Sequence, residues 1–257
     1  MIVSTDGIVL KSTTIPSGRV MLSIFTLKYG KISVGADSSK IKRRTKSSLA
    51  SSPFTYGKYE FFKGRTFNFN GVDIKNSFFS FGEDIDKYMI ASYALELTDK
   101  VLPEEVPEPK LFATLRDFMK SLEKRRKEYD LLLIAYELKL LKTLGVSPAF
   151  DRCVSCGASD IAYFSGEHGG TLCEKCAKQG SNIISGSNGK NQRGQADLIL
   201  CRDFDIFNVV SFLIKQPFVR LEGLVLDKEI QETMKRILKS HIYENLAIRT
   251  LKSEAGI

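Results

Sequence analysis

The stretch VMLSIFTLKYGKISV, residues 20–34, decides the fold of the first third of this 257-residue chain. Its two halves are short runs of β-branched and aromatic residues on either side of a turn signal, Tyr29-Gly30-Lys31. Comparable runs stand at Ile8–Leu10, Tyr59–Phe62 and Phe78–Phe81, and the pair Asn70-Gly71 predicts a further hairpin. Four to six short strands in about 80 residues predict a small closed barrel.

The positive charge of the chain is concentrated in this first third. The net charge is +8, and residues 1–80 contain 13 Lys/Arg against 4 Asp/Glu, a net of +9, whereas the remaining residues contain 25 against 26, a net of −1. A concentrated positive field attracts a polyanion, and nucleic acid is the commonest polyanion in a cytoplasm. The alternative is that the charge only keeps the protein in solution.

Five cations fall within seven residues between two expected strands, and hydroxyl side chains surround them: Lys40, Lys42, Arg43, Arg44 and Lys46. Long cations and hydroxyls reach phosphate oxygens, and packing five like charges together has no structural benefit. Aromatic residues follow closely, and small barrels bind single strands by combining a cationic groove with stacking rings. At least half of these rings are expected to fill the barrel instead. The expected DNA contacts are Arg19, Lys40, Lys42, Arg43, Arg44, Lys46, Lys63 and Arg65.

From Glu83 onward the hydrophobic period changes from two to four residues, which is typical of one helical face. Helices are expected from Ile85, over Leu111–Leu122, over Leu131–Leu144, over Ile206–Lys215 and over Asp227–Lys252, the last with Asp227 as N-cap. The run Lys124–Lys127 lies at a helix end, where the helix dipole favours cations, so it gives only a weak indication of DNA binding.

Four of the five cysteines form two close pairs, Cys153-Val-Ser-Cys156 and Cys173-Glu-Lys-Cys176. Two residues between cysteines let both sulfurs face one point, and two such knuckles supply the four thiolates that suit a tetrahedral Zn²⁺. A redox pair is the main alternative, although a thioredoxin-like site needs only one such motif. A filled four-sulfur site leaves no open position for water, so one structural zinc is expected.

The remaining candidate ligands favour simpler roles. His168 is expected to be an exposed loop residue, His241 to lie within the last helix with a solvent-facing or partly buried ring, and Cys201 to be a small buried residue. The chain contains no P-loop, no dinucleotide-binding glycine pattern and no H-E-x-x-H, so the sequence gives no support to a catalytic site and predicts that the protein is not an enzyme. No apolar run reaches the roughly 18 residues of a membrane helix, and the N-terminus lacks a signal-peptide pattern, so a cytoplasmic protein is expected. With the expected DNA binding, its place is the nucleoid.

The chain resembles the RecO family of DNA repair proteins. In order, the residues that carry the resemblance are Gly7–Leu10, Ile24–Thr26, Tyr29–Lys31, Ala94–Leu97, Tyr136–Leu141, Leu144–Pro148, Cys153–Gly157, Phe164-Ser165, Gly169-Gly170, the pair Cys173 and Cys176, and Leu251–Ser253. The segment from Tyr136 to Cys176 is the most specific part.

This resemblance implies an α+β protein: an N-terminal oligonucleotide-binding (OB) fold, then an all-helical domain with an inserted four-cysteine zinc finger. The expected domains are a basic OB-fold barrel at 1–80 and a helical domain at 81–257, with the zinc knuckle module at 151–180 and a flexible loop at 180–196.

The resemblance also implies a recombination mediator that binds single- and double-stranded DNA. Such a protein anneals strands and loads recombinase onto DNA coated by single-strand-binding protein. The implied partners are RecR and the C-terminal tail of single-strand-binding protein. Basic positions beside apolar ones make the helical domain the expected site for that tail: Lys215, Phe218 and Arg220, and Lys235, Arg236 and Lys239. The alternatives are a zinc-ribbon protein that binds RNA or serves transcription, and a nuclease.

Overall fold

The computed structural model describes residues 1–16, 18–37, 48–182, 198–201, 204–248 and 250–253. Contacts divide the chain into two compact units, Met1–Tyr129 with Thr250–Ile257, and Asp130–Arg249. Each unit is described by itself. Among the described residues, no helix has both the length and the apolar character that crossing a membrane requires.

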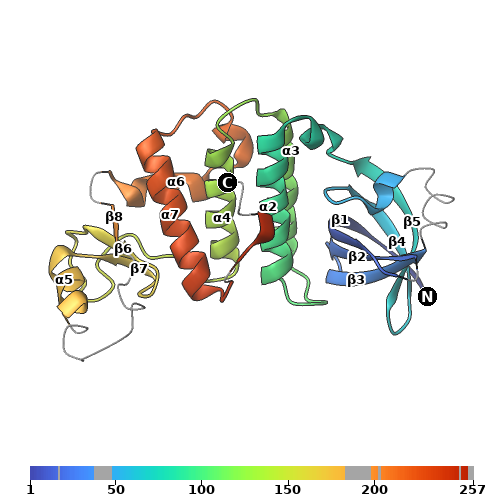
Figure 1. Cartoon of the computed structure of the whole chain (residues 1–257), viewed down its shortest axis with the longest axis horizontal. Coiled ribbons are helices and arrows are strands. Elements are labelled where there is room, and N and C mark those ends of the chain that lie inside the picture. Colours follow the sequence, from blue (N-terminus) through green and yellow to red (C-terminus); the bar gives the residue numbers. More distant parts are fainter. Residues whose placement is uncertain (17, 38–47, 183–197, 202–203, 249, 254–257) are drawn as a thin grey trace. The chain divides into compact units, whose positions relative to one another are not determined.

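The N-terminal unit contains a closed five-stranded barrel in the order β1-β2-β3-β5-β4 (Figure 1), as the sequence predicts. The strands are β1 Ile2–Thr14, β2 Arg19–Thr26, β3 Gly30–Asp37, β4 Tyr56–Lys63 and β5 Phe67–Asn76. All neighbours are antiparallel except β3 and β5, where Val34 pairs with Phe67 and Gly35 with Asn68. Alternate residues of every strand point inward and form a core around the fully buried Ile24, Val34 and Tyr59.

The hairpin expected at Asn70-Gly71 is wrong, because these residues lie inside β5. The chain turns instead between Lys63 and Phe67, where β4 pairs with β5. Phe67 and Phe69 both point into the core, so the inward and outward alternation of a strand runs up to Phe69. Gly71 pairs with Glu60 beside a register shift between Glu60 and Phe61, so the glycine lies at a bulge.

The strand expected at Phe78–Phe81 is also wrong, because this segment forms a 3₁₀-helix, η2 Phe79–Glu83. A spacing of three residues places Phe78 and Phe81 on one side of such a turn. Their rings stack at 5.3 Å and are buried, whereas Phe79 remains 69% exposed. The cluster of phenylalanines therefore reflects a helical turn and not an alternating strand.

Two helices, α2 Ile85–Val101 and α3 Pro109–Lys124, belong to the same unit as the barrel. The hydroxyl of Ser23 in β2 donates to Asp99 of α2 over 2.6 Å, and the ammonium of Lys31 donates to the backbone oxygen of Asp99 over 2.6 Å. The ring of Phe112 in α3 packs edge-on against Phe25 of β2 at 5.4 Å. Because α2 and α3 pack on the barrel in this way, the first compact unit extends to Tyr129, whereas the boundary predicted from the sequence lies at residue 80.

The second unit contains three helices and the cysteine module. The helices are α4 Tyr129–Thr143, α6 Ile206–Lys215 and α7 Lys228–Asn245, with a 3₁₀-turn η4 Phe218–Leu221. The module is built from β6 Tyr163–Ser165, β7 Gly170–Leu172, α5 Glu174–Asn182 and β8 Ile199–Leu200, with the strands in the order β7-β6-β8.

Helix α7 begins as the sequence predicts and ends earlier. The Asp227 side chain accepts from the backbone N–H of Glu229, which is an N-cap. The helix ends at Asn245 and not at Lys252, because Ala247 adopts a left-handed conformation with φ of 53°. A helix cannot continue through that conformation.

Candidate metal centre and nucleic-acid interface

The four paired cysteines converge on one point. The sulfurs of Cys153, Cys156, Cys173 and Cys176 all lie within 4.8 Å of one another, and Cys156 Sγ is 3.7 Å from Cys173 Sγ. In a regular tetrahedron with Zn–S bonds of about 2.3 Å, neighbouring sulfurs stand about 3.8 Å apart. The arrangement therefore has the dimensions of a four-thiolate metal site.

Each knuckle is held by local backbone geometry. In the first, Gly157 donates its N–H to the oxygen of Cys153 over 2.8 Å, and Cys153 donates its own to Ala158 over 2.8 Å. Gly157 has φ of 77°, a conformation that favours glycine, so the tight turn requires it. In the second, Cys173 immediately precedes α5 and Cys176 lies in its first turn, where the backbone N–H of Cys176 points at the Cys173 sulfur over 3.5 Å.

The two knuckles are joined through β7. Val154 donates its N–H to the oxygen of Thr171 over 2.8 Å, and Thr171 donates to Ala149 over 2.9 Å. A β-carbon at Gly170 would lie 2.5 Å from Val154 Cγ1 and 2.8 Å from the oxygen of Ala149. The absence of a side chain at Gly170 therefore lets the first knuckle lie directly on the strand that leads into the second.

The electrostatics of the cluster fit a bound cation. Burial raises the pKa of the Cys153 thiol, but hydrogen bonds from backbone N–H groups of both knuckles outweigh it and lower the pKa to about 6. The Ser155 hydroxyl lowers the pKa of Cys176, but the neighbouring sulfurs of Cys156 and Cys173 raise it to about 12. The cluster favours the first thiolate and opposes the last, so all four cysteines can be thiolates together only with a positive ion among them.

The other candidate ligands of the described chain lie outside this cluster. His168 is exposed, and its Nδ1 is 3.0 Å from the Ser165 hydroxyl. His241 is buried, its Nε2 lies 2.7 Å from the oxygen of Val146, and burial lowers its pKa. Cys201 is buried within the fold. These positions match the roles expected for His168 and Cys201. The expectation of a solvent-facing or partly buried ring is wrong for His241, which is only 2% exposed.

A row of outward-facing residues crosses the barrel at right angles to its strands. Directly paired residues of adjacent strands point to the same side. The pairs Met21–Gly35, Gly35–Asn68 and Asn68–Phe62 connect β2, β3, β5 and β4 in register, and Ile2 of β1 pairs with Phe62. Met21, Phe62 and Ile2 are 37%, 43% and 58% exposed. We call Ile2, Met21, Gly35, Phe62 and Asn68 the transverse stripe.

Arg19, one of the expected DNA contacts, lies at this stripe. A β-carbon at Gly35 would stand 3.2 Å from Nη2 of Arg19 and 3.5 Å from Oδ1 of Asn68. The guanidinium therefore occupies the space above Gly35, and it points from β2 across β3 toward β5. Asn68 was not among the predicted contacts, and Phe62 was predicted only as one of the aromatic rings near the cation-rich segment. The signal for Phe62 was its place in the alternation, since its neighbour Phe61 is fully buried.

The other expected contacts lie in different surroundings. Lys63 is half-buried, and its ammonium lies 4.6 Å from the ring centre of Tyr29 and 5.3 Å from that of Phe67. Arg65 is exposed in the turn between β4 and β5. The residues Lys40, Lys42, Arg43, Arg44 and Lys46 lie outside the described residues. Of the five aromatic residues that follow them in the sequence, Tyr59 and Phe61 belong to the barrel core, as expected, and Phe62 is exposed. Phe54 and Tyr56 are buried instead against rings of η2, α2 and α3.

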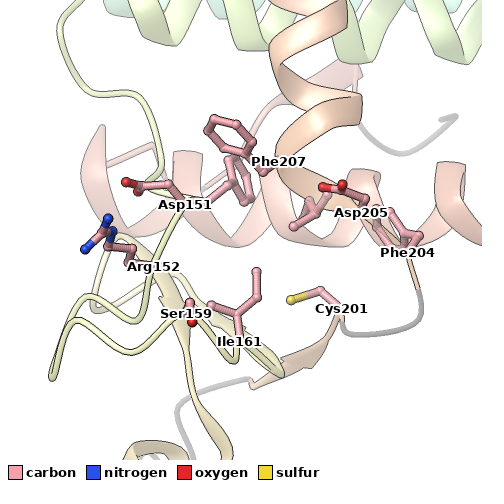
Figure 2. A pocket seen from close by; sticks show the side chains of 10 residues that line it. Asp151, Arg152, Ser159, Ile161, Cys201, Phe204, Asp205 and Phe207 are labelled. Atoms are coloured by element: carbon pink, nitrogen blue, oxygen red, sulfur yellow. The ribbon is translucent and has the colours of Figure 1, made fainter.

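Two of the positions expected to receive a peptide tail, Phe218 and Lys235, are engaged within the protein. Phe218 is buried, and the ammonium of Lys139 lies 5.4 Å from its ring centre. Lys235 pairs with Asp130 over 2.8 Å. A separate cavity of about 390 Å³ lies in this unit. Its lining, drawn in Figure 2, includes the apolar side chains of Ile161 and Phe207. Asp151, Arg152 and Asp205 also line it, so its charge is mixed.

The protein is of the mixed α+β class. It combines a small OB-like barrel with a helical part, into which a four-cysteine cluster of the kind that binds metals is inserted. A family model described as Recombination protein O N terminal matches residues 1–78, and one described as Recombination protein O C terminal matches residues 82–189. The chain belongs to the RecO family of DNA repair proteins.

Similar curated proteins carry the same family name. The DNA repair protein RecO of Alkaliphilus metalliredigens is 30% identical over 251 residues, which cover 96% of this chain and 94% of that protein. The one of Caldanaerobacter subterraneus is 27% identical over 94% of this chain and 92% of its own length. The one of Clostridium acetobutylicum is 29% identical over 94% of this chain and 91% of its own length.

Proposed function

We propose that this protein is a DNA-binding recombination mediator that acts by binding and not by catalysis. It binds single- and double-stranded DNA, promotes strand annealing, and loads recombinase onto DNA coated by single-strand-binding protein. Its place of action is the cytoplasm, at the nucleoid. Membership of a DNA repair family supports a role in recombination and repair, and the net charge of +9 in residues 1–80 supports a polyanionic partner.

The observation that carries the DNA assignment is the transverse stripe with Arg19 above it. An exposed ring at Phe62 offers a face on which a base stacks, and Asn68 and Arg19 offer groups that hydrogen-bond bases or phosphates. Binding of this kind tolerates many sequences, because every base has a stacking face and every nucleotide has a phosphate. The cations at positions 40–46 supply the electrostatic part of the affinity.

The test is DNA binding by the full chain with Lys42, Arg43 and Arg44 reversed to Glu, measured by anisotropy of a labelled single strand at several salt concentrations. This charge-reversed variant is expected to lose most of its affinity while its circular dichroism is unchanged. Phe62→Ala is expected to lower single-strand affinity by about fivefold or more, since stacking contributes about 1–3 kcal/mol per base.

An unchanged affinity in the charge-reversed variant would show that these cations are only a solvated surface. Competition with an RNA strand of the same sequence addresses the zinc-ribbon alternative, in which RNA is the preferred partner.

We propose that Cys153, Cys156, Cys173 and Cys176 hold one Zn²⁺. The separations between their sulfurs and the charge balance of the cluster support a tetrahedral, borderline-soft dication. Four protein ligands fill a tetrahedron, so such a zinc stabilises the module and takes no part in chemistry.

We propose RecR and the acidic tail of single-strand-binding protein as protein partners, with the tail bound by the helical part, residues 81–257. A tail that ends in acidic residues, an aromatic residue and a carboxylate requires an apolar groove with a cation at its rim. Calorimetric titration of a tail peptide into the full chain and into the charge-reversed variant tests the location. Equal affinities are expected, and a loss of peptide binding in that variant would move the groove to the barrel.

A further inference from the structure

A second cavity, of about 350 Å³, lies in the N-terminal unit between the barrel and α2. Its walls come from Leu10–Ser12 of β1, from Pro53-Phe54, and from α2 between Tyr88 and Lys100, with Lys252 at one side. Sites for small ligands span roughly 300–1,000 Å³, so the cavity has room for one group of nucleotide size. Pro53 and Phe54 follow shortly after the cation-rich residues 40–46 in the sequence.

Three exposed lysines border this cavity: Lys11, Lys100 and Lys252. None of their ammonium groups makes a hydrogen bond or ion pair with another described residue. Lys11 follows the bulge at Leu10, where the β1–β2 register shifts between Val9 and Lys11. A bulge redirects the side chains that follow it, so the local irregularity of β1 places this cation at the cavity.

The two carboxylates of the cavity are already bonded within the protein. Glu96 accepts from the backbone N–H of Lys252 over 3.0 Å, and from the N–H and hydroxyl of Ser253 over 2.9 and 2.7 Å. Asp99 accepts from Ser23 over 2.6 Å. These neutral donors do not cancel the charge of Glu96, which also attracts Lys100, whereas Asp99 is partly balanced by Lys31 at 4.0 Å. Three lysines face two carboxylates, one of them shared with Lys31, so the cavity keeps a net positive charge, which favours an anionic ligand.

An aromatic ring stands beside these cations. Tyr88 is 46% exposed, and its ring contacts Phe54 edge-on at 5.6 Å, while Phe54 contacts Phe81 in the same way at 5.5 Å. Phe54 adopts φ of 74°, which is unfavourable for a residue with a β-carbon. Its N–H bond to the oxygen of Val9 over 3.0 Å holds that conformation. Strain of this kind tends to be retained at functional positions, and here it fixes the ring that orients Tyr88.

Outward-facing residues of β1 connect the transverse stripe to this cavity. Thr13 pairs with Met21 of the stripe, and Lys11 lies two residues before Thr13 on the same outward face of β1. Two residues of a strand span about 7 Å. A single strand that crosses the stripe from β4 to β2 therefore reaches Lys11 within about one nucleotide step.

We propose that this cavity is a second nucleotide site, which holds one unstacked base of a single strand against Tyr88 and the adjoining phosphates against Lys11, Lys100 and Lys252. The inference rests on the proposed DNA-binding function and extends it from the barrel onto α2. In this arrangement, the DNA strand leaves the transverse stripe through the cavity beside α2.

The chain contains no tryptophan, so Tyr88→Trp introduces a fluorophore that reports on this position alone. Stacking of a base is expected to quench its emission when an oligothymidylate of about 16 nucleotides, the upper range for one OB fold, saturates the full chain. Tyr243→Trp is the matched control, because Tyr243 is 48% exposed on α7, and its emission is expected to stay unchanged. Anisotropy of the same labelled strand measures binding independently.

A second experiment removes the three lysines together, as Lys11→Gln, Lys100→Gln and Lys252→Gln. Each phosphate contact contributes about 0.7 to the slope of log affinity against log salt for single strands, so the slope is expected to fall by about 2. The matched control replaces Lys110, Lys142 and Lys228, which are also exposed, by Gln. It carries the same change of net charge and is expected to keep the slope.

The outcomes separate this inference from the proposed function. Suppose that the strand binds the wild-type protein and does not bind the charge-reversed variant. If Tyr88→Trp then shows no quenching and replacement of the three lysines leaves the salt slope unchanged, the cavity is not a nucleotide site. If no strand binds wild type, the proposed function fails as well. Quenching by polyglutamate but not by the oligonucleotide would assign the cavity to an acidic protein and overturn the inference.

Discussion

Replacing Gly170 by Ala tests whether the two cysteine knuckles depend on their close approach. The new β-carbon would stand 2.5 Å from Val154 Cγ1 and 2.8 Å from the oxygen of Ala149, well inside normal contact. The Ala149 oxygen already accepts from Thr171 over 2.9 Å, so the backbone cannot withdraw without stretching that bond. Val154 adjoins Cys153, and its displacement moves one sulfur away from the other three.

Overpacking of this kind costs about 1–3 kcal/mol. Because metal binding and folding of the module are coupled, the same energy is expected to appear as a loss of metal affinity. The expected loss is roughly 5- to 150-fold, since about 1.4 kcal/mol corresponds to a factor of ten. The assay is zinc retention by the full chain in competition with a chelator, with thermal unfolding of the zinc-loaded protein as a second measurement.

Gly223→Ala is the matched control, because no atom lies within 4 Å of a β-carbon at that position. This variant is expected to retain zinc like wild type. If Gly170→Ala also retains zinc like wild type, the knuckles do not depend on their contact across β7 and the reasoning is refuted.

Three further predictions concern the metal, the barrel and the helical unit. Cys173→Ser is expected to lower the zinc content from about one ion per chain to near zero, because a tetrahedral site loses a ligand; wild-type protein purified reduced and without chelator but free of zinc would contradict it. Asp6→Asn is expected to destabilise the barrel by about 1 kcal/mol at neutral pH, because the Asp6 carboxylate accepts from Lys75 over 2.8 Å and from Tyr56 over 2.9 Å. Burial raises the pKa of Asp6, but the hydrogen bonds from Lys75 and Tyr56 outweigh burial and hold the pKa below its ordinary value. The stabilisation is therefore present above a pH of about 4 and is lost as the pH falls through the lowered pKa of the folded state. Urea unfolding should therefore separate Asp6→Asn from wild type at neutral pH and not at low pH, and an equal difference at both would contradict the assignment. Lys139→Met is expected to lower the free energy of unfolding by about 2 kcal/mol or more, because the ammonium donates to the oxygens of Ile214 over 2.6 Å and Gln216 over 2.8 Å, and both acceptors would lose their partner. Lys142→Met, on the exposed side of α4, is the control, and an equal loss in both variants would show that the two bonds are not responsible.

The structure confirms the elements that depend on short-range patterns. The alternation in residues 20–34 predicts two strands, and β2 and β3 occupy that stretch. The spacing within each cysteine pair predicts two knuckles, and the glycine after the first pair fits the turn that closes it. Asp227 acts as the N-cap of α7, because capping depends only on residues within one turn.

The errors arose where distant residues choose between local alternatives. Asn70-Gly71 is a favourable turn by itself, but the pairing of β5 with β4 and β3 keeps it inside a strand. Phe78–Phe81 has strand-like composition, but stacking of Phe78 on Phe81 and contact of Phe81 with Phe54 favour a helical turn. Propensity is a weak preference that tertiary contacts override.

The sequence by itself determined the class of each part: a charged β region, a helical region and a four-thiolate cluster with the right spacing. These follow from hydrophobic period, net charge and cysteine spacing, which are local quantities. Only the tertiary structure decided which surface is available. It places Arg19 over Gly35 beside Asn68, joins α2 to the barrel through Ser23 and Asp99, and brings Lys252 to Lys11 across more than two hundred residues of chain. Such juxtapositions depend on strand register and helix packing, which no local pattern in a single sequence specifies.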